Sequence, residues 1–221
     1  MKLIVTGFNA FGEIAENPSE QTIHRLPDFV KVDETDEPID VAKLTLTTCC
    51  SDSWDELKRA IESIKSSMPA EKFGIIMAGV AGNRDKICLE RFALNVRQYR
   101  IPDNNQHRPD DEHIEPNAPD ALRTSLPVKS MVEELNNAGY ACDVSNHAGT
   151  YVCNETYFRA LHEYNSDPNC IGVLFVHVPP FESYKHTDPN HVDEREAKQI
   201  FEDAMHKIIQ MVAANGLATE V

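Results

Sequence analysis

The stretch Phe73–Ala78, FGIIMA, is an almost continuous apolar run. Strands of a parallel sheet that helices cover on both faces have sequences of this kind, because neither side of the strand meets water. A second run, Ile171–Val178 (IGVLFVHV), stops at Pro179 and Pro180. Both runs predict strands, and the first predicts a strand buried within a parallel sheet.

Shorter extended segments alternate with helical patterns along the rest of the chain. Further strands are expected at Lys2–Thr6, Val41–Thr47 and about Tyr140–Ser145, with an interrupted extended segment at Ile87–Val96. Helices are expected from Asn17-Pro18-Ser19-Glu20, from Ser53-x-x-Glu56, from Pro127 to Gly139, after Cys153, and from near Val192 to Asn215 before Gly216. The alternation predicts a single-domain, three-layer α/β/α sandwich around a largely parallel (mixed), twisted sheet over residues 1–221.

The composition narrows the class of protein. The chain has 221 residues and a mass of 24.8 kDa, which is most simply one α/β domain. Its 21 basic and 36 acidic residues give a formal charge of −15, which argues against nucleic acid or an anionic membrane as the main partner. The apolar run after Lys2 is too short for a signal peptide, and no run approaches the ~20 residues of a membrane span. We therefore expect a soluble, cytoplasmic protein.

The six cysteines are too sparse for a disulfide scaffold, and no two form a Cys-x-x-Cys pair. Cys49 and Cys50 are adjacent and therefore awkward to bridge to each other, so most of the six are expected to be small buried hydrophobic residues. No ligand spacing recurs among the histidines that lie near aspartates, which are His107, His113, His186 and His191. The sequence thus predicts neither a metal nor a cofactor.

Cys153 and His177 are both expected at the carboxyl ends of strands, where open α/β sheets bind their ligands. Cys153 follows a glycine turn and opens a helix, whose dipole and free amides would lower the thiol pKa from ~8.5 and hold an oxyanion. A nearby imidazole would take the thiol proton and return it to a leaving amine. By position alone, however, each residue could have a purely structural role. Cys153 could be a buried core residue, His177 a hydrogen-bonded residue at the end of a buried strand, and Glu90 a member of a surface ion pair.

Five stretches of the chain occur in a specific order: VTGFNAFGEIAENPS (5–19), AGVAGNRDKICLERFALNV (78–96), RIPDN (100–104), SNHAGTYVCNETYF (145–158) and FVHVP (175–179). Together they resemble the pyroglutamyl peptidase I family, cysteine omega-peptidases that remove N-terminal pyroglutamate. Each stretch alone is a weak signal, but their joint order over most of residues 1–180 is highly specific. The resemblance also implies a phosphorylase/hydrolase-like version of the sandwich.

The resemblance implies a role for each candidate residue. Cys153 matches the family's nucleophile, His177 its general base and Glu90 the acid that orients the imidazole. The implied substrate-binding residues are Phe8, Phe11, Thr48, Val80, Arg100, Ile101, Tyr151 and Val152. Two of them depart from common family residues. Val80 replaces a glutamine of many bacterial relatives, which could loosen contact with the substrate, and Tyr151 replaces a frequent phenylalanine, which adds a hydroxyl that needs a partner.

The implied activity is release of pyroglutamate from blocked peptides through an acyl-enzyme on Cys153, without a metal or cofactor. Family members often form dimers or tetramers, so a homo-oligomer is expected. A non-catalytic relative that binds peptide N-termini and a nucleoside-phosphorylase-like enzyme are the alternatives. For the latter, Gly7 and Gly12 fit neither the dinucleotide-binding fingerprint nor a P-loop. A purely structural protein lacks support, because the chain shows no repeat or coiled coil.

Residues 102–120 (PDNNQHRPDDEHIEPNAPD) are proline-rich, acidic and almost devoid of apolar residues. Long loops inside compact domains tend to be functional or mobile. Because this segment directly follows Arg100 and Ile101, we expect it to form a mobile loop near the active site.

Overall fold

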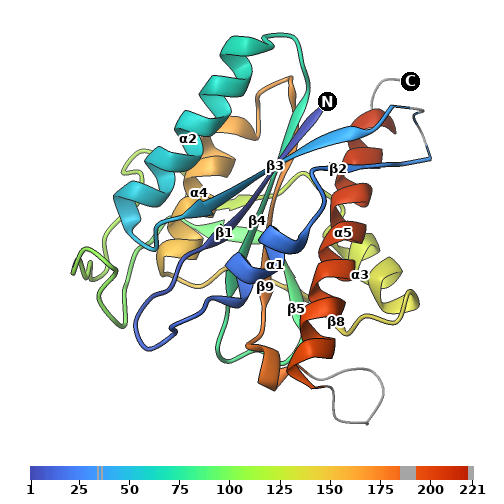
Figure 1. Ribbon diagram of the computed structural model, residues 1–221. Coiled ribbons are helices and arrows are strands. Elements are labelled where there is room, and N and C mark those ends of the chain that lie inside the picture. Colours follow the sequence, from blue (N-terminus) through green and yellow to red (C-terminus); the bar gives the residue numbers. More distant parts are fainter. Residues whose placement is uncertain (34, 36, 185–192, 219–221) are drawn as a thin grey trace.

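The computed structural model describes residues 1–33, 35, 37–184 and 193–218, and strands alternate with helices along the chain (Figure 1). The strands are β1 (Lys2–Phe8), β2 (Phe29–Val30), β3 (Ile39–Leu46), β4 (Phe73–Val80), β5 (Ile87–Glu90), β6 (Phe92–Leu94), β7 (Ala121–Arg123), β8 (Cys142–Ser145) and β9 (Cys170–Val178). The helices are α1 (Pro18–Arg25), α2 (Cys50–Ser67), α3 (Val128–Asn137), α4 (Val152–Tyr164) and α5 (Glu194–Ala218), with a short 3-10 helix at Phe181–Ser183.

One mixed sheet has seven strands in the order β2-β3-β1-β4-β9-β5-β8. Strands β3, β1, β4 and β9 run parallel to one another, and β5 runs parallel to β8. The direction reverses where β5 pairs with β9 and where the short β2 pairs with β3. Strands β6 and β7 form a separate antiparallel pair. The prediction of a largely parallel, mixed sheet is therefore confirmed.

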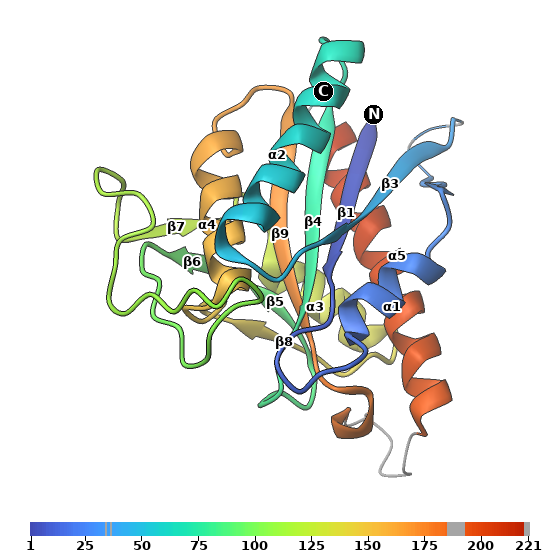
Figure 2. The same ribbon diagram turned by 60° about the vertical axis from the view of Figure 1, so that its left-hand side comes forward.

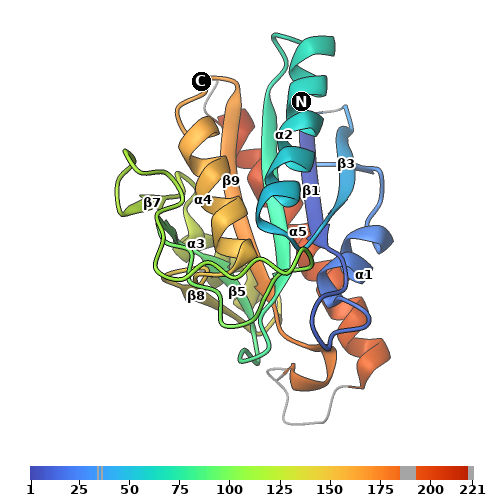
Figure 3. The same ribbon diagram turned by 90° about the vertical axis from the view of Figure 1, so that its left-hand side faces the viewer.

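Helices cover both faces of the sheet, as Figures 1 and 3 show. On one face α2 and α4 bury a core that includes Phe158, and on the other α1, α3 and α5 bury a core that includes Phe201. Successive residues of β4 pack into opposite cores. Ile76 lies in the core that includes Phe201, and Met77 lies in the core that includes Phe158. This explains why FGIIMA has no polar position, and the predicted three-layer sandwich is confirmed.

Local signals placed several element boundaries correctly. The Asn17 side chain accepts a hydrogen bond from the Ser19 N–H (3.0 Å), and Pro18 is the first residue of α1. Gly139 follows α3 with a left-handed φ of 95°, as expected after a helix end. The extended segment 87–96 forms β5 and β6, and Arg91 separates them.

The predicted start of α2 at Ser53 is wrong, since the helix begins at Cys50. The Ser53 hydroxyl is buried and bonds the Thr156 hydroxyl of α4 (2.8 Å), so it cannot cap a helix. Glu56 instead accepts a hydrogen bond from the N–H of Thr47 (2.8 Å), outside the helix. The two polar residues that resemble a capping box therefore join α2 to its neighbours.

The predicted end of α5 at Asn215 is also wrong, because Gly216 lies inside a helix that continues to Ala218. A Cβ at Gly216 would lie 2.7 Å from the Ile171 side chain, so this glycine allows close approach of α5 to β9 rather than ending the helix. The predicted start near Val192 lies outside the described residues. Strands β2 and β7 were not predicted, because two and three residues show no alternation.

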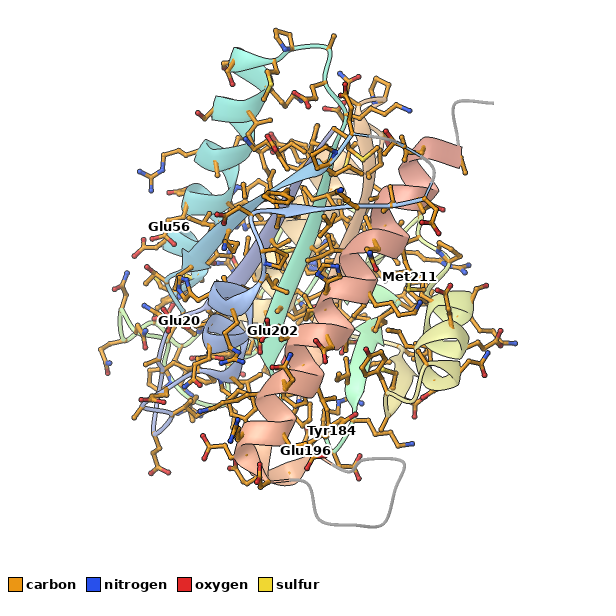
Figure 4. All side chains as sticks on the ribbon, turned by 45° about the vertical axis from the view of Figure 1, so that its right-hand side comes forward. Glu20, Glu56, Tyr184, Glu196, Glu202 and Met211 are labelled. Atoms are coloured by element: carbon orange, nitrogen blue, oxygen red, sulfur yellow. The ribbon has the colours of Figure 1, made fainter. Side chains whose placement is uncertain are left out.

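Figure 4 shows Tyr184 beside α5. Its hydroxyl accepts a hydrogen bond from the Ala141 N–H (2.9 Å), and its ring packs edge-on against Phe201 of α5. The glutamates labelled in Figure 4 belong to α1, α2 and α5. None of the helices in the described residues is long and apolar enough to cross a membrane.

The segment between β6 and β7 crosses the end of the molecule where α2 and α4 begin (Figure 2). It contains the predicted loop 102–120, which is attached at several points. The N–H of Asn104 donates to the Thr48 carbonyl (3.0 Å), the Tyr151 hydroxyl donates to the Pro102 carbonyl (3.0 Å), and Ile114 is buried in the core. The loop thus lies against the end of the sheet where the candidate residues gather.

Candidate active site

Cys153 is the second residue of α4. The chain reaches it through Gly149, whose φ of 81° is left-handed, and through Tyr151, the residue that precedes the helix. The first helical hydrogen bond runs from the Glu155 N–H to the Tyr151 carbonyl (3.1 Å). The amides of Val152 and Cys153 therefore have no partner within the helix, and they are available to hold negative charge beside the sulfur.

His177 lies near the end of β9, and Glu90 ends the neighbouring antiparallel strand β5. The register pairs Cys88 with His177 and Glu90 with Phe175, so Glu90 and His177 occupy diagonal positions on one face of the sheet. Their Nδ1 and Oε1 atoms are 2.7 Å apart, and both side chains are buried. The interpretation of Glu90 as a surface ion pair is therefore wrong.

The hydrogen bond to Glu90 sets the tautomer of the imidazole. A neutral His177 donates its Nδ1–H to the carboxylate and presents the lone pair of Nε2. A second cation, Arg84, lies 3.8 Å from the same carboxylate oxygen, while Oε2 has no hydrogen-bond partner among the described residues. His177 is thus the one hydrogen-bond partner of the Glu90 carboxylate among the described residues.

Gly79 makes room for the sulfur beside His177. Strand β4 pairs Gly79 with His177 of β9. A Cβ added at Gly79 would lie 2.9 Å from the Cys153 Sγ and 2.8 Å from the Phe175 ring, which is closer than real Cβ contacts. A side chain at this position would displace the sulfur, so the glycine of AGVAG is required by space.

The thiol of Cys153 is enclosed by protein, although part of the residue remains accessible. Burial and, to a smaller extent, the charge of Glu90 raise the pKa of Cys153 to about 12, against a hydrogen bond from the residue's own N–H. The predicted lowering of this pKa is therefore wrong, because the loss of water outweighs the helix end. The Cys153 thiol is therefore neutral at rest, and it would have to give up its proton in order to attack a substrate.

Cys153 and His177 line a cavity of about 100 Å³. Sites for drug-sized ligands hold ~300–1,000 Å³, so this one accepts a single small group. The full lining is Phe8, Phe11, Asn17, Thr48, Val80, Ala148, Gly149, Thr150, Tyr151, Cys153 and His177. A hollow of about 710 Å³ against the first turn of α5 is larger, but its described lining holds no cysteine or histidine.

The structure brings most of the predicted site residues to this cavity. Those that line it are Phe8, Phe11, Thr48, Val80, Tyr151, Cys153 and His177. Those outside its lining are Glu90, which lies behind His177, the fully buried Val152, the exposed Arg100 and the half-buried Ile101. Their roles toward a substrate stay predictions.

Sequence reasoning missed Asn17, Ala148, Gly149 and Thr150 as lining residues. Asn17 was interpreted only as a helix cap, yet its amide also donates to the Asn9 carbonyl (3.1 Å), which holds the first loop at the cavity. The other three lie three to five residues before Cys153, so the glycine turn ahead of this cysteine was the signal that could have found them.

Tyr151 and Phe11 form one side of the cavity, with ring centroids 5.8 Å apart. The ring of Tyr151 also packs against Tyr99 (4.6 Å). Its hydroxyl donates to the Pro102 carbonyl (3.0 Å), which supplies the partner that this hydroxyl needs. Burial raises the pKa of Tyr151 to about 12, so the hydroxyl remains a donor at neutral pH.

A thiol, an imidazole oriented by a carboxylate, and a cavity for one small group define a cysteine-dependent hydrolase. A family model described as pyroglutamyl peptidase matches residues 1–211. The pyrrolidone-carboxylate peptidase of Finegoldia magna is 35% identical over 179 residues, which cover 81% of this chain and 78% of that protein. The pyrrolidone-carboxylate peptidase of Thermococcus kodakarensis is 37% identical over 179 residues, or 81% of each chain.

Solved structures agree with these relatives over nearly the whole chain. Pyroglutamyl peptidase I of Bacillus amyloliquefaciens superposes with a TM-score of 0.77 at 28% identity, covering 96% of this chain and 97% of that one. The pyrrolidone carboxyl peptidase of Pyrococcus furiosus gives a TM-score of 0.80 at 27% identity, covering 98% and 100%. The chain belongs to the pyroglutamyl peptidase family of cysteine peptidases.

Proposed function

We propose that this protein is a cysteine exopeptidase that hydrolyses the N-terminal pyroglutamyl (5-oxoprolyl) residue from peptides and proteins. One observation carries the proposal: Cys153 and His177 line a cavity of about 100 Å³, and Glu90 lies 2.7 Å behind the imidazole. In this proposal Cys153 is the nucleophile, His177 the general base and acid, and Glu90 the residue that orients and stabilises the imidazolium.

The first half-reaction forms an acyl-enzyme. As the Cys153 Sγ attacks the pyroglutamyl carbonyl carbon, the S–C bond forms and the thiol proton moves to Nε2 of His177. The amides of the first turn of α4 hydrogen-bond the oxyanion. When the tetrahedral intermediate collapses, the C–N bond breaks and His177 gives its proton to the leaving amine.

The second half-reaction returns the enzyme to its starting state. A water molecule gives a proton to His177 and attacks the acyl carbon, and the C–S bond then breaks. The sulfur takes back the proton from His177, and pyroglutamate leaves as the acid. Glu90 stabilises the imidazolium in both halves, and one water balances the whole cycle.

The cavity suits the pyroglutamyl group, an uncharged five-membered lactam with one N–H and one ring carbonyl. Phe8 and Phe11 supply apolar ring surfaces, and the backbone of 148–150 lies beside the cavity to meet the two polar atoms. Proline lacks the ring carbonyl, so it would leave a donor of the site unpaired. Glutamate would bring charge into a small apolar space. Both should be rejected.

Two other functions fit less well. A non-catalytic relative that binds peptide N-termini would not need a buried carboxylate behind the histidine, yet Glu90 contacts His177 at 2.7 Å. A nucleoside-phosphorylase-like enzyme would need a phosphate site, and a chain of charge −15 with no phosphate-binding motif does not favour one.

We also infer that residues 1–221 act as one peptidase domain, in the cytoplasm and as a homo-oligomer, with pyroglutamyl-blocked peptides rather than nucleic acid or membranes as partners. The oligomer rests on the family resemblance, the location on the apolar pattern of the sequence, and the choice of partner on its acidic charge. Light scattering coupled to gel filtration will measure the number of chains, and a monomer at micromolar concentration would contradict the oligomer.

The decisive experiment is hydrolysis of a fluorogenic pyroglutamyl amide by the reduced protein, with the prolyl amide as the substrate control. We expect turnover of the first and almost none of the second. Cys153→Ser should keep the fold and lose almost all turnover. The enzyme assignment fails if the reduced wild-type protein releases no fluorophore, and the nucleophile assignment fails if Cys153→Ser remains active.

A further inference from the structure

A second group of reactive side chains lies at the start of α2, next to the cavity but outside its lining. Cys49 and Cys50 open this helix, and Asp103 and His107 reach it from the loop that begins at residue 102. Ligand atoms of Cys49, Cys50 and Asp103 all lie within 4.8 Å of one another. The Cys50 Sγ is 3.4 Å from Nδ1 of His107. Two thiols, a carboxylate and an imidazole thus converge from two distant segments.

We propose that these four residues form a binding site for a thiophilic divalent cation of the Zn²⁺ class. Such an ion prefers four ligands of sulfur, nitrogen and oxygen, and its bond lengths of ~2.0–2.3 Å place tetrahedral ligands roughly 3.5–3.8 Å apart. The spacing of Cys50 and His107 is already close to that range. Four protein ligands would leave no position for water, which is typical of a structural rather than a catalytic site.

Asp103 is prepared for this role by its surroundings. It is 2% exposed, and its carboxylate accepts hydrogen bonds from the N–H groups of Cys50 (3.0 Å), Asn105 (2.9 Å) and His107 (2.9 Å). These three bonds fix the orientation of the Asp103 carboxylate. A fixed, negatively charged ligand is therefore in place beside both thiols.

An ion at this site would fasten the loop to α2. The same loop contacts the cavity, since the Asn104 N–H donates to the Thr48 carbonyl (3.0 Å) and the Pro102 carbonyl accepts from Tyr151 (3.0 Å). None of the four proposed ligands lines the cavity itself. The site is thus separate from Cys153, and the proposal does not depend on the peptidase reaction.

The test measures Zn²⁺ binding by the full chain under reducing conditions, in competition with a chromophoric chelator. Cys153→Ala is the parent protein, so that Cys153 and His177 cannot bind the ion together. We expect one Zn²⁺ per chain, and Co²⁺ should give thiolate-to-metal absorption. Adding Cys49→Ser, Cys50→Ser or His107→Asn should weaken binding at least about tenfold, because even groups that only support metal ligands are worth roughly 10–100-fold.

Matched controls come from the same chain. Cys170→Ser, at the start of β9, and His113→Asn, at another exposed position of the same loop, should leave the affinity unchanged. Zn²⁺ should also raise the melting temperature of the parent and slow cleavage within 102–120, but not in the His107→Asn variant. Absence of stoichiometric binding by the folded parent overturns the proposal. So does equal affinity of the His107→Asn and His113→Asn variants, both of which change exposed residues.

Discussion

Glu90 and Glu155 are almost completely buried, at 0% and 1% exposure, but their surroundings differ. Glu155, in the first turn of α4, receives a hydrogen bond from the Tyr99 hydroxyl (2.8 Å) and ion pairs from Arg97 (3.4 Å) and Arg159 (3.3 Å). Glu90 has only a histidine in direct contact, a more distant arginine, and one oxygen without a partner among the described residues.

The difference separates two uses of a buried carboxylate. Glu155 contacts two arginines and a tyrosine hydroxyl, so it holds α4 to the segment around residue 97. Glu90 lacks such a set of partners, and its one close contact is the imidazole of His177. We therefore expect Glu155 to contribute to stability with little effect on turnover, and Glu90 to contribute to turnover with little effect on stability.

The largest expected effect is on catalysis, in Glu90→Gln. The amide keeps the size of the side chain but removes the charge that stabilises the imidazolium. The equivalent change in a serine-protease triad costs roughly 10⁴ in turnover, and a cysteine enzyme loses less because a thiol is more acidic than a serine hydroxyl and gives its proton to the imidazole more readily. We expect kcat to fall about 10- to 10³-fold, with a nearly unchanged KM and melting temperature. Full activity of the Glu90→Gln variant would show that catalysis depends on Cys153 and His177 without Glu90.

Glu155→Gln should give the reverse pattern. Removing one partner of a buried ion pair lowers the free energy of unfolding by roughly 3–5 kcal/mol. We expect the low end of this range, because Arg97 still pairs with Glu112 and Arg159 still pairs with Glu115. A loss of about 3 kcal/mol would lower the melting temperature by roughly 6–12 °C in a chain of this size. Turnover of the folded variant should change little. A large fall in kcat without loss of stability would remove the contrast with Glu90.

Gly79→Ala tests whether the sulfur beside Glu90 and His177 needs its space. The added Cβ would meet the Cys153 Sγ at 2.9 Å, and a displacement of ~1 Å in a reacting group can cost about 10²-fold. We expect kcat/KM to fall about 10- to 100-fold. Gly82→Ala is the matched control, since a Cβ there meets nothing within 4 Å. Equal activity of the two variants would show that β4 does not set the position of the sulfur.

The smallest effect concerns Cys142, a group that is buried in its neutral form. Burial, with help from Cys88 and Asp143, raises its pKa from 9.0 to about 12. The folded state therefore holds a proton that the unfolded state has lost, so this contribution to stability is complete below pH ~9 and declines as the pH rises toward about 12. Between pH 8 and pH 10, the free energy of unfolding measured in urea should fall by about 1 kcal/mol more for the wild type than for Cys142→Ala. Parallel losses would contradict the raised pKa.

Local signals in the sequence were sufficient for most of the fold. The apolar run of β4, the cap at Asn17 and the glycine after α3 each depend on a few neighbouring residues, and the structure confirms them. The start of α2 was not predictable in this way. Ser53 hydrogen-bonds Thr156 of α4, and Glu56 accepts a hydrogen bond from Thr47 after β3, so neither side chain caps the helix backbone. A polar pair with capping spacing does not show where its hydrogen bonds go.

In the candidate site too, features that depend on order along the chain were predictable, and features that depend on packing between distant segments were not. The places of Cys153 and His177 at strand ends were predicted from order along the chain, and the contact with Glu90 came only through the family resemblance. Burial of Glu90 depends on the register between β5 and β9, and the raised pKa of Cys153 depends on how completely the cavity excludes water. The group formed by Cys49, Cys50, Asp103 and His107 depends on how the loop folds back on α2.

The antiparallel register of β5 and β9 also has a consequence for folding kinetics. Glu90 and His177 are 87 residues apart in the chain, and their contact exists only after these two strands have paired. Contacts of such sequence separation are slow to form, because a long loop must close first. The single tryptophan, Trp54, lies in α2. Its ring lies 6.3 Å from the Tyr164 ring of α4, a contact of even larger sequence separation, so its fluorescence during refolding should recover together with enzymatic activity rather than ahead of it.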